Sequence, residues 1–455
     1  MNRNIPLKKN AGKEHLYTML QAIAETTGQV EVSFCNYDVV ENRELSPSHL
    51  FLQCYRASTG NLLADYEDIK KIPTSYISTE FFEEKDYWNE KLFEETNYLA
   101  QDALKLYENI KLGLEGERNR LEERLTKFDG QIQIDVDEFD PRRNKEIVMS
   151  SSQLELLATC PFSYFLQYVL NVNPVEETEF TPNRWLDPAM RGSLLHKIFE
   201  TFYKELKERG EKPRFQQHNR LIENLAISLI EEQKEMVPPP NDRVFHRESQ
   251  DILECCRIFL MEEESHTETY EPFEFEYSFG LNGQPPAEIP LPTGETIRVK
   301  GIIDRIDRTK SGSHYHIIDY KTGSTYGYDN NKIFKGGRQL QHYIYALAIE
   351  AHLRLQEGTV QESAYYFPTV KGLAERIVRR QDETLRTNGG LVLENLINLI
   401  GHGTFTMTDH TDDCKFCEFK QVCRRNYYDK DLFEGKQMDP NNAGLRYFKG
   451  VRAYD

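Results

Sequence analysis

From Phe273 onward, hydrophobic and polar side chains alternate with a period of two, the pattern of strands that bury one face. The segments EFEYSFGL, TIRVKGIIDRIDRT and HYHIIDYKTG follow this pattern, and the turn-forming stretches LNGQPP and KSGS separate them. They predict a three-stranded meander. The apolar segment SAYYFPTV predicts another short strand further along the chain.

Other parts of the chain place apolar residues at helical spacing. The serines at 150–152 precede one such run and predict its N-cap. Pro161 interrupts this run, because proline cannot donate the helix hydrogen bond. Residues 236–243 contain three consecutive prolines and break the pattern again. Helices are predicted over residues 188–207, 248–264, 336–355 and 382–400.

The first 125 residues are predicted to be mostly helical. The segment SFCNYDVVENRELSPSHLFLQCYRA predicts a strand, a loop and a helix capped at Ser46 or Ser48, with Pro47 in its first turn. Residues 87–127 predict a long, polar amphipathic helix or helix pair. A polar connector at 128–143 follows, so we predict a helical region over 1–144, a second domain over 145–430 and a C-terminal tail over 431–455.

Composition narrows the class of protein. The chain has 455 residues, 39% of them hydrophobic and 11% aromatic, which excludes a disordered polymer. Its net charge of −18 argues against a non-specific polycation coat for nucleic acid. We expect no membrane segment and no secretion signal, and eight cysteines in this length indicate a reducing, cytoplasmic compartment. The sequence contains no GxxxxGK[ST] phosphate loop, which excludes a Walker-type ATPase site.

The strongest chemical signal is the tripeptide Asp319-Tyr320-Lys321. Residues two apart on a strand share a face, so Asp319 and Lys321 project together while Tyr320 faces away. Taken alone, this is a surface ion pair worth about 0–1 kcal/mol. A hairpin turning near residues 310–313 brings Asp304 close to Asp319, and two converging carboxylates repel unless a cation lies between them. Hard oxygen ligands select Mg²⁺ or Mn²⁺.

A histidine completes this group. Gly192, His196 and Glu200 share one helix face, and the small glycine allows that face to approach a sheet closely. Alone, His196 would be an ordinary core or surface histidine. With Asp304 and Asp319 it suits phosphodiester hydrolysis, in which a metal lowers the pKa of a water and a lysine stabilises developing charge.

The order G-x3-H, G-x-I-D-R-I-D, I-D-Y-K-T-G and Q-x3-Y resembles the RecB/AddB branch of the PD-(D/E)XK nuclease superfamily. The resemblance implies an α/β (α+β) fold, with a restriction-endonuclease-like core whose mixed central sheet is flanked by helices, plus the helical N-terminal extension. Every core motif position is present, so we expect an active nuclease. Glu276, on the strand before, is a weaker candidate that we leave out of the ligand set. The resemblance implies that His196, Asp304 and Asp319 bind the metal, that Lys321 is catalytic, and that Gln339 and Tyr343 face the site and contact DNA phosphate.

Three cysteines lie within ten residues, at 414, 417 and 423. They are either reduced core thiols or part of a zinc site, and a tetrahedral ion would need a fourth ligand. The resemblance implies that the fourth ligand is Cys160, in a C-P-F-x-Y-F segment. It also implies that the four cysteines bind a structural 4Fe–4S cluster, which links the start of the nuclease domain to its end. The cysteines at 35, 54, 255 and 256 are predicted to be ordinary buried thiols.

Basic residues surround the three cysteines. Lys415, Lys420, Arg424 and Arg425 form a patch next to aromatic side chains. Charge and stacking could bring this patch to a DNA strand, and the alternative is a solvated cationic surface.

These observations favour a metal-dependent DNA nuclease that acts in repair or recombination, and the resemblance implies that it is exonucleolytic or single-strand-preferring. The resemblance implies that residues 1–144 are a remnant of an AddB-like helicase arm, and that any motor is a separate AddA/UvrD-type helicase subunit. The first alternative is a non-catalytic DNA-binding or scaffold subunit of a helicase–nuclease complex. The second is an RNA-directed or adaptation-type nuclease of mobile-element defence, which would use the same chemistry.

Overall fold

A computed structural model describes residues 8–38, 43–72, 83, 86–87, 104–105, 107–133, 135–174, 181–423, 425 and 430–454. The chain forms two compact units, Met1–Lys111 and Leu112–Asp455. None of the helices in these residues combines the length and apolar character needed to cross a membrane.

Apart from α1, a helix of 18 residues, the first unit contains short elements. Ser48 caps α2 by accepting a hydrogen bond from the Phe51 amide, so Pro47 lies before the cap and not in the first turn. The long helix expected from residue 87 is described over α6, and residues 88–103 and 106 lie outside the described residues. The elements are α1 (Lys8–Glu25), β1 (Tyr37–Asp38), β2 (Arg43–Glu44), α2 (His49–Thr59) and α3 (Tyr66–Lys70), with α6 (Glu108–Arg120) leading into the second unit.

The second unit is built on a seven-stranded mixed sheet of order β3-β6-β7-β8-β9, in which β4 and β5 also pair with β6. The predicted meander is confirmed, because β4, β6 and β7 are antiparallel neighbours. β8 runs parallel to β7, and β3 runs parallel to β6. The strands are β3 (Val148–Ser150), β4 (Tyr270–Phe279), β5 (Ala287–Pro290), β6 (Thr296–Thr309), β7 (Tyr315–Tyr320), β8 (Val360–Tyr366) and β9 (Arg376–Arg380).

Three of these strands were not predicted from the sequence. β3 and β5 have three and four residues, too few to show an alternation. β9 has the sequence RIVRR, in which the buried positions are Ile377 and Arg379 while Val378 is exposed, so it shows no apolar alternation. These strands nonetheless complete the mixed α/β architecture expected of a restriction-endonuclease-like core.

Local sequence signals set the helix ends. Ser150 accepts from the Gln153 amide and forms a capping box with that residue, and Pro161 starts a new helix after the break at Cys160. α12 begins after Asn241, earlier than the predicted residue 248. The helices are α7 (Val136–Phe139), α8 (Ser151–Thr159), α9 (Pro161–Tyr164) with a π-helical turn (Phe165–Val169), α10 (Pro188–Arg209), α11 (Phe215–Met236), α12 (Asp242–His266), α13 (Gln341–His352), α14 (Glu383–Gly401), α15 (Lys420–Cys423), α16 (Lys430–Gln437) and α17 (Ala443–Arg452).

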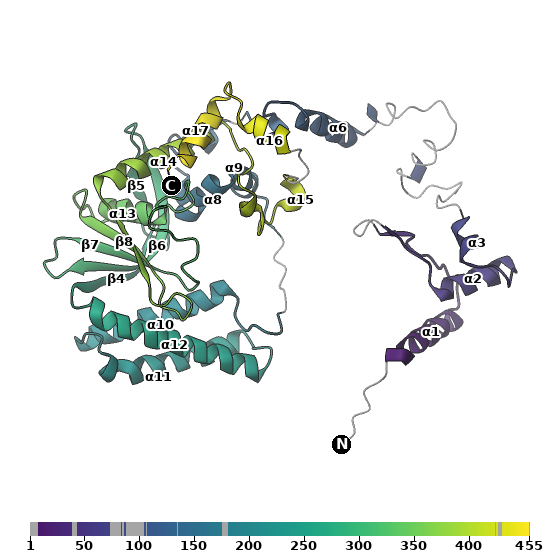
Figure 1. Ribbon diagram of the computed structural model, residues 1–455, viewed down its shortest axis with the longest axis horizontal. Coiled ribbons are helices and arrows are strands. Elements are labelled where there is room, and N and C mark those ends of the chain that lie inside the picture. The colour runs from purple at the N-terminus through teal and green to yellow at the C-terminus, as the bar shows by residue number, and fades with distance from the viewer. Residues whose placement is uncertain are drawn as a thin grey trace, which may run out of the picture. The chain divides into compact units, whose positions relative to one another are not determined.

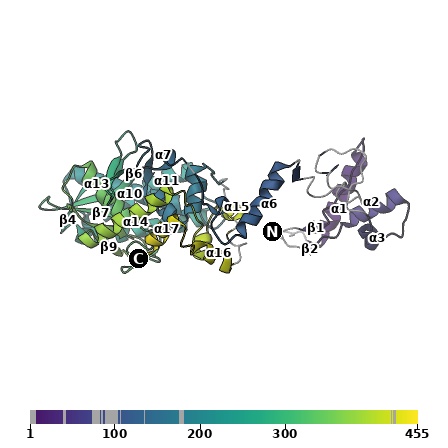
Figure 2. The same ribbon diagram turned by 90° about the horizontal axis from the view of Figure 1, so that it is seen from above.

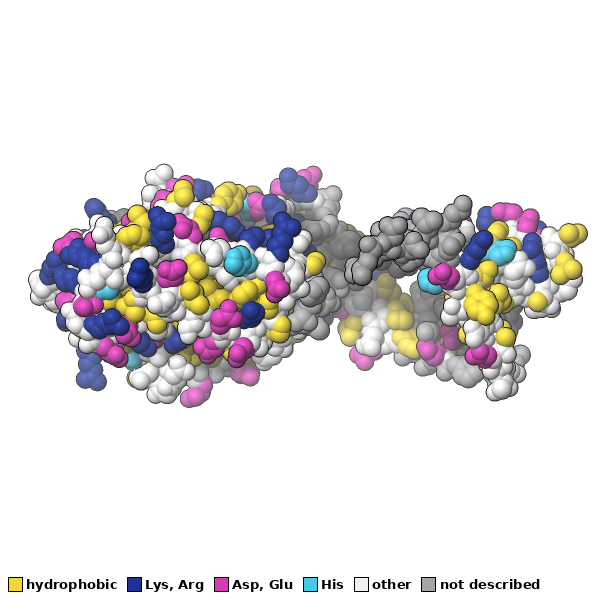
Figure 3. Space-filling view, turned by 90° about the horizontal axis from the view of Figure 1, so that it is seen from below, with side chains coloured by type: hydrophobic (Ala, Val, Ile, Leu, Met, Phe, Trp, Pro, Cys, Tyr) yellow, Lys and Arg dark blue, Asp and Glu magenta, His cyan; other side chains and the backbone are white. Residues whose placement is uncertain are grey.

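Helices cover both faces of the sheet, with α10, α11 and α12 on one side and α13 and α14 on the other (Figure 1). On β7, Ile317 joins the core under α13 and α14, whereas Ile318 and Tyr320 join the core under α10 and α12. Asp319 therefore lies on the α13 side, as the strand period predicts. On the face seen from below in Figure 3, acidic and basic side chains are interspersed.

The limits of the second unit differ from the predicted 145–430. Lys436 of α16 donates a hydrogen bond to the carboxylate of Asp129 at 2.9 Å, and the two residues form a buried ion pair. The Phe405 amide donates to Gly130, so residues before 144 pack onto this unit. α17 packs along α14 in both views (Figures 1 and 2). Residues 431–455 are thus part of the fold and not a tail, because their apolar positions Leu445, Phe448 and Val451 recur at helical spacing and are buried.

Candidate metal centre

Three carboxylates form a row across adjacent strands. The register of β4 on β6 places Glu276 across from Asp304, and the register of β6 on β7 continues to Asp319. Like charges that face each other across strands destabilise a sheet. The row therefore indicates a site in which a cation offsets the repulsion.

His196 reaches this row from α10. Its Nδ1 lies 3.4 Å from Asp304 Oδ1, and its Nε2 lies 3.2 Å from the carbonyl oxygen of Tyr320. Ligand atoms of His196, Glu276 and Asp304 all lie within 4.8 Å of one another. A Cβ on Gly192, one turn earlier, would lie 3.5 Å from the Thr322 hydroxyl, an ordinary van der Waals contact, so the approach of this helix face does not depend on glycine as was predicted.

The structure groups two of the three predicted ligands, His196 and Asp304, and adds Glu276. Asp319 lies next to His196 and Asp304 but outside their 4.8 Å group, and Glu276 takes the third place in that group. From the sequence alone, Glu276 is the weaker candidate that was left out of the ligand set. The signal that could have favoured it was its place across the hairpin from Asp304.

Glu276 carries two marks of a functional residue. Its φ of +47° is unusual for a residue with a side chain and is found where the surroundings impose it. Burial, and then the charge of Asp304, raise the pKa of Glu276 to about 7. Both features oppose placing a carboxylate here, so its position is best explained by the binding of a positive charge.

Asp319 and Lys321 form a close ion pair, with Lys321 Nζ 2.5 Å from Asp319 Oδ2. Burial raises the pKa of Asp319 to about 6, with Lys321 opposing and Asp304 adding to the shift. Burial alone would lower the pKa of Lys321, but the charge of Asp319 outweighs it and raises that pKa. Lys321 is therefore a fixed positive charge beside the ligand group.

The predicted placement of Gln339 and Tyr343 facing the site is corrected by the structure. Gln339 donates to the carbonyl of Gly327, and Tyr343 packs against Phe334 and Gly389. The pattern Q-x3-Y occurs twice in QLQHYIY, two residues apart, and two residues rotate a helix by about 200°. The second copy faces the site.

That second copy consists of Gln341 and Tyr345. Gln341 Oε1 accepts from Lys321 Nζ at 3.0 Å, and Gln341 Nε2 donates to the Tyr345 hydroxyl at 3.2 Å. Because an ammonium can only donate, this contact fixes the orientation of the Gln341 amide.

The four predicted cluster cysteines lie in one region. Burial first, and then the charges of Cys160, Cys417 and Cys414, raise the pKa of Cys423 to about 12. The Ser163 hydroxyl lies 3.7 Å from Cys417 Sγ. All four cysteines are among the described residues, and no three of their sulfurs lie mutually within 4.8 Å.

The other cysteines are not all buried as expected. Cys255 and Cys256 are buried, Cys54 is partly exposed and Cys35 is exposed. Of the predicted DNA-binding arginines, Arg424 lies outside the described residues. Arg425 stacks its guanidinium on the ring of Phe433, 3.7 Å from the centroid, which holds it against the protein.

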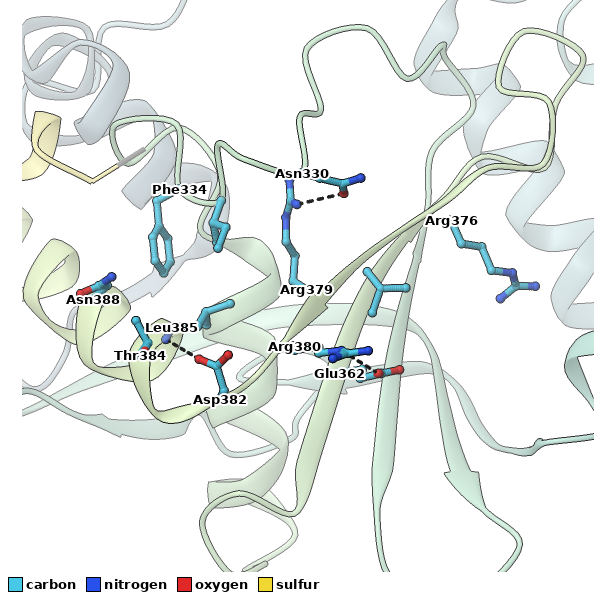
Figure 4. A pocket seen from close by; sticks show the side chains of 12 residues that line it. Asn330, Phe334, Glu362, Arg376, Arg379, Arg380, Asp382, Thr384, Leu385 and Asn388 are labelled. Carbon is cyan, nitrogen blue, oxygen red and sulfur yellow. Dashed lines mark hydrogen bonds and ion pairs between the residues drawn. The ribbon is translucent and has the colours of Figure 1, made fainter.

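A separate hollow of about 600 Å³ runs along the edge strand β9. Side chains of β9, of the start of α14 and of the loop at 330–334 line it, including Arg379 and Asp382 (Figure 4). Arg379 donates to the carbonyl of Asp329 at 2.6 Å and so ties that loop to the strand. The proposed metal ligands and Lys321 are not among its lining residues, so this hollow is distinct from the candidate metal centre.

A nitrogen and several carboxylate oxygens converging beside a buried acid–lysine pair define a site for a hard divalent cation at which a phosphodiester can react. The sequence model of the PD-(D/E)XK nuclease superfamily matches residues 148–424, more than half of the chain. The chain belongs to this superfamily.

Similar proteins include several that are named as subunits of an ATP-dependent helicase/deoxyribonuclease. The Clostridium perfringens protein is 30% identical over 266 residues, covering 57% of this chain and 21% of its own length. The Acetivibrio thermocellus protein is 24% identical over 350 residues, covering 61% and 30%. The Clostridioides difficile protein is 28% identical over 229 residues, covering 48% and 19%. The chain thus spans less than a third of the length of these relatives.

Proposed function

We propose that this protein is a metal-dependent DNA nuclease, exonucleolytic or single-strand-preferring, that acts in DNA repair or recombination. The observation that carries the proposal is the convergence of His196, Glu276 and Asp304 beside the Asp319–Lys321 pair. The superfamily and the deoxyribonuclease names of the relatives support the same chemistry.

The ligand set fits Mg²⁺ or Mn²⁺. Carboxylate oxygens are hard donors, and one imidazole is compatible with these ions. His196, Asp304 and Glu276 would hold the ion, with Asp319 completing the row. A bound divalent cation supplies Lewis-acid stabilisation of a phosphate oxygen and lowers the pKa of a water.

The protein's own groups then orient the reaction. Lys321 is held between Asp319 and Gln341, so its ammonium has a defined direction. It orients the attacking water or neutralises charge that develops on the phosphate. Gln341 and Tyr345 take over the phosphate-contacting role predicted for Gln339 and Tyr343.

A 4Fe–4S cluster on Cys160, Cys414, Cys417 and Cys423 is the second part of the proposal. A single zinc ion with Zn–S bonds of about 2.3 Å would need its thiolates about 3.8 Å apart. No three of these sulfurs lie mutually within 4.8 Å, and the support for a cluster is the cysteine pattern itself, with Cys160 before the nuclease core and three cysteines after it. A cluster bound in this way cross-links residues that are more than 100 positions apart. By the chain-entropy estimate, it adds roughly 5 kcal/mol to the free energy of unfolding.

The proposed partners are DNA and a separate AddA-type helicase in the cytoplasm. The relatives are named as subunits of an ATP-dependent helicase/deoxyribonuclease, and this sequence has no Walker phosphate loop. A helicase partner would supply the motor that these names imply.

The test is cleavage of end-labelled single- and double-stranded DNA with and without Mg²⁺. Asp304→Asn and Lys321→Ala should each lose about 10²–10³ in rate, whereas Glu383→Gln, an exposed glutamate in the first turn of α14, should match the wild type. Undiminished cleavage by both site variants would reject the proposal. Wild-type DNA binding without any cleavage would favour the scaffold alternative.

A further inference from the structure

Helix α13, which carries Gln341, begins without a cap of its own. Its N-cap residue, Leu340, makes no side-chain hydrogen bond to the first turn. The first amides of a helix need acceptors from outside the helix. Glu155 of α8 provides one, because its Oε1 accepts from the Leu340 amide at 2.7 Å and from the Gln341 amide at 2.9 Å.

The capped residue is the one that touches the lysine. Gln341 Oε1 accepts from Lys321 Nζ, so a single residue separates the Glu155 carboxylate from the reactive ammonium. Burial raises the pKa of Glu155, while its two amide bonds and the charge of Lys321 oppose the shift. Glu155 is therefore in electrostatic contact with the site.

The segments that carry the cysteines brace the same helix start. α8 ends one residue before Cys160, and Arg452 donates to its last carbonyls and, at 2.7 Å, to Gly336 ahead of α13. Arg338 forms a two-point ion pair with Asp413, the residue before Cys414, at 2.7 and 3.2 Å. Two separate links thus run from the cysteine region to the beginning of α13.

We infer that Glu155 is a positioning residue: by capping α13 from a neighbouring helix it holds Gln341 where its amide oxygen orients Lys321 beside Asp319. The inference rests on the proposed nuclease function and deepens it. The inference also assigns a role to α8: this helix ends beside Cys160 and, through Glu155 and Gln341, positions Lys321.

The experiment is a double-mutant cycle in single-turnover cleavage of single-stranded DNA with Mg²⁺. Glu155→Ala should lower the rate constant at saturating DNA by roughly 10- to 100-fold, with the Kd for DNA unchanged. Glu155→Gln should retain most of the rate constant, because both amides bond to one oxygen that glutamine also offers. Glu383→Gln is the matched control on an exposed helix start.

The cycle partner is Gln341→Ala. If Glu155 acts through Gln341, the double variant Glu155→Ala/Gln341→Ala is no slower than Gln341→Ala alone. Additive losses, or wild-type rates for Glu155→Ala, overturn the inference. Glu155→Asp, shorter by one methylene, takes the place of the alanine variant if thermal melting shows that the latter is unfolded. A wild-type protein that fails to cleave DNA would instead reject the proposed function.

Discussion

Glu276 and Asp304 face each other across β4 and β6, and their carboxylates lie with the His196 ring in one group of ligand atoms within 4.8 Å. Two carboxylates in such proximity, one of them on a backbone with φ of +47°, oppose folding until a cation binds. This relationship makes the stability of the metal-free protein informative about the site.

We expect Glu276→Gln to stabilise the metal-free protein by on the order of 1 kcal/mol while weakening Mn²⁺ binding, because it removes one of two repelling charges that an ion needs. Thermal melts in EDTA and titration calorimetry with Mn²⁺ measure both effects. Glu223→Gln, at an exposed position in the middle of α11, should change neither. A variant that loses stability and keeps its Mn²⁺ affinity would show that Glu276 is a structural residue.

A second prediction compares two glutamines two residues apart. Gln341→Ala should lower the cleavage rate constant by about 10-fold or more, because Lys321 loses the acceptor that orients it. Gln339→Ala removes only the hydrogen bond to Gly327 and should cost about 1 kcal/mol of stability with little effect on turnover. Equal kinetic losses in the two variants would contradict the assignment of the second Q-x3-Y copy.

The cysteine set predicts a coloured protein. Anaerobic purification should give a brown protein with thiolate-to-iron absorption, and Cys160→Ser or Cys423→Ser should lose iron and stability together. Cys35→Ser, at an exposed thiol, is the control and should keep both. A colourless protein that contains stoichiometric zinc would contradict the iron–sulfur cluster and indicate a zinc site.

A fourth prediction concerns the buried Arg305, which donates to Asp307 at 2.6 Å and to Glu263 at 2.7 Å. Arg305→Met removes a buried guanidinium from both carboxylates, leaving Glu263 with Arg376 and Asp307 with His266, and should cost about 3–5 kcal/mol of unfolding free energy. Arg308→Met, on the same strand with an exposed ion pair, should cost about 1 kcal/mol or less. Urea unfolding measures both.

The buried ion pairs of Glu263 with Arg305 and Arg376 make the stability of the protein depend on pH. Burial would raise the pKa of Glu263, but Arg305 and Arg376 outweigh burial and lower it to about 2. A carboxyl group with a lowered pKa stabilises the fold fully above its ordinary pKa of about 4.5 and loses that contribution as the pH falls toward 2. The urea concentration at the midpoint of unfolding should therefore fall as the pH is lowered below about 4.5. A midpoint that does not change with pH in this range would contradict the ionised state assigned to Glu263.

Local patterns in the sequence determined much of the site. The period of two predicted β4, β6 and β7, placed Asp319 and Lys321 on one face and turned Tyr320 away. Helix signals such as Ser150, Pro161 and Pro188 act within a few residues, so they could be recognised without a structure.

Tertiary structure decided what depends on register and rotation. Glu276 joins the ligand group because of its strand register against Asp304. Gln341 replaces Gln339 because α13 begins only at Gln341, five residues later than predicted, and directs the side chain of Gln341 to Lys321. The contact between Asp129 and Lys436 assigns both ends of the second unit to one fold. These relationships join residues far apart along the chain, whose proximity is set by packing of whole elements and not by the residues beside them.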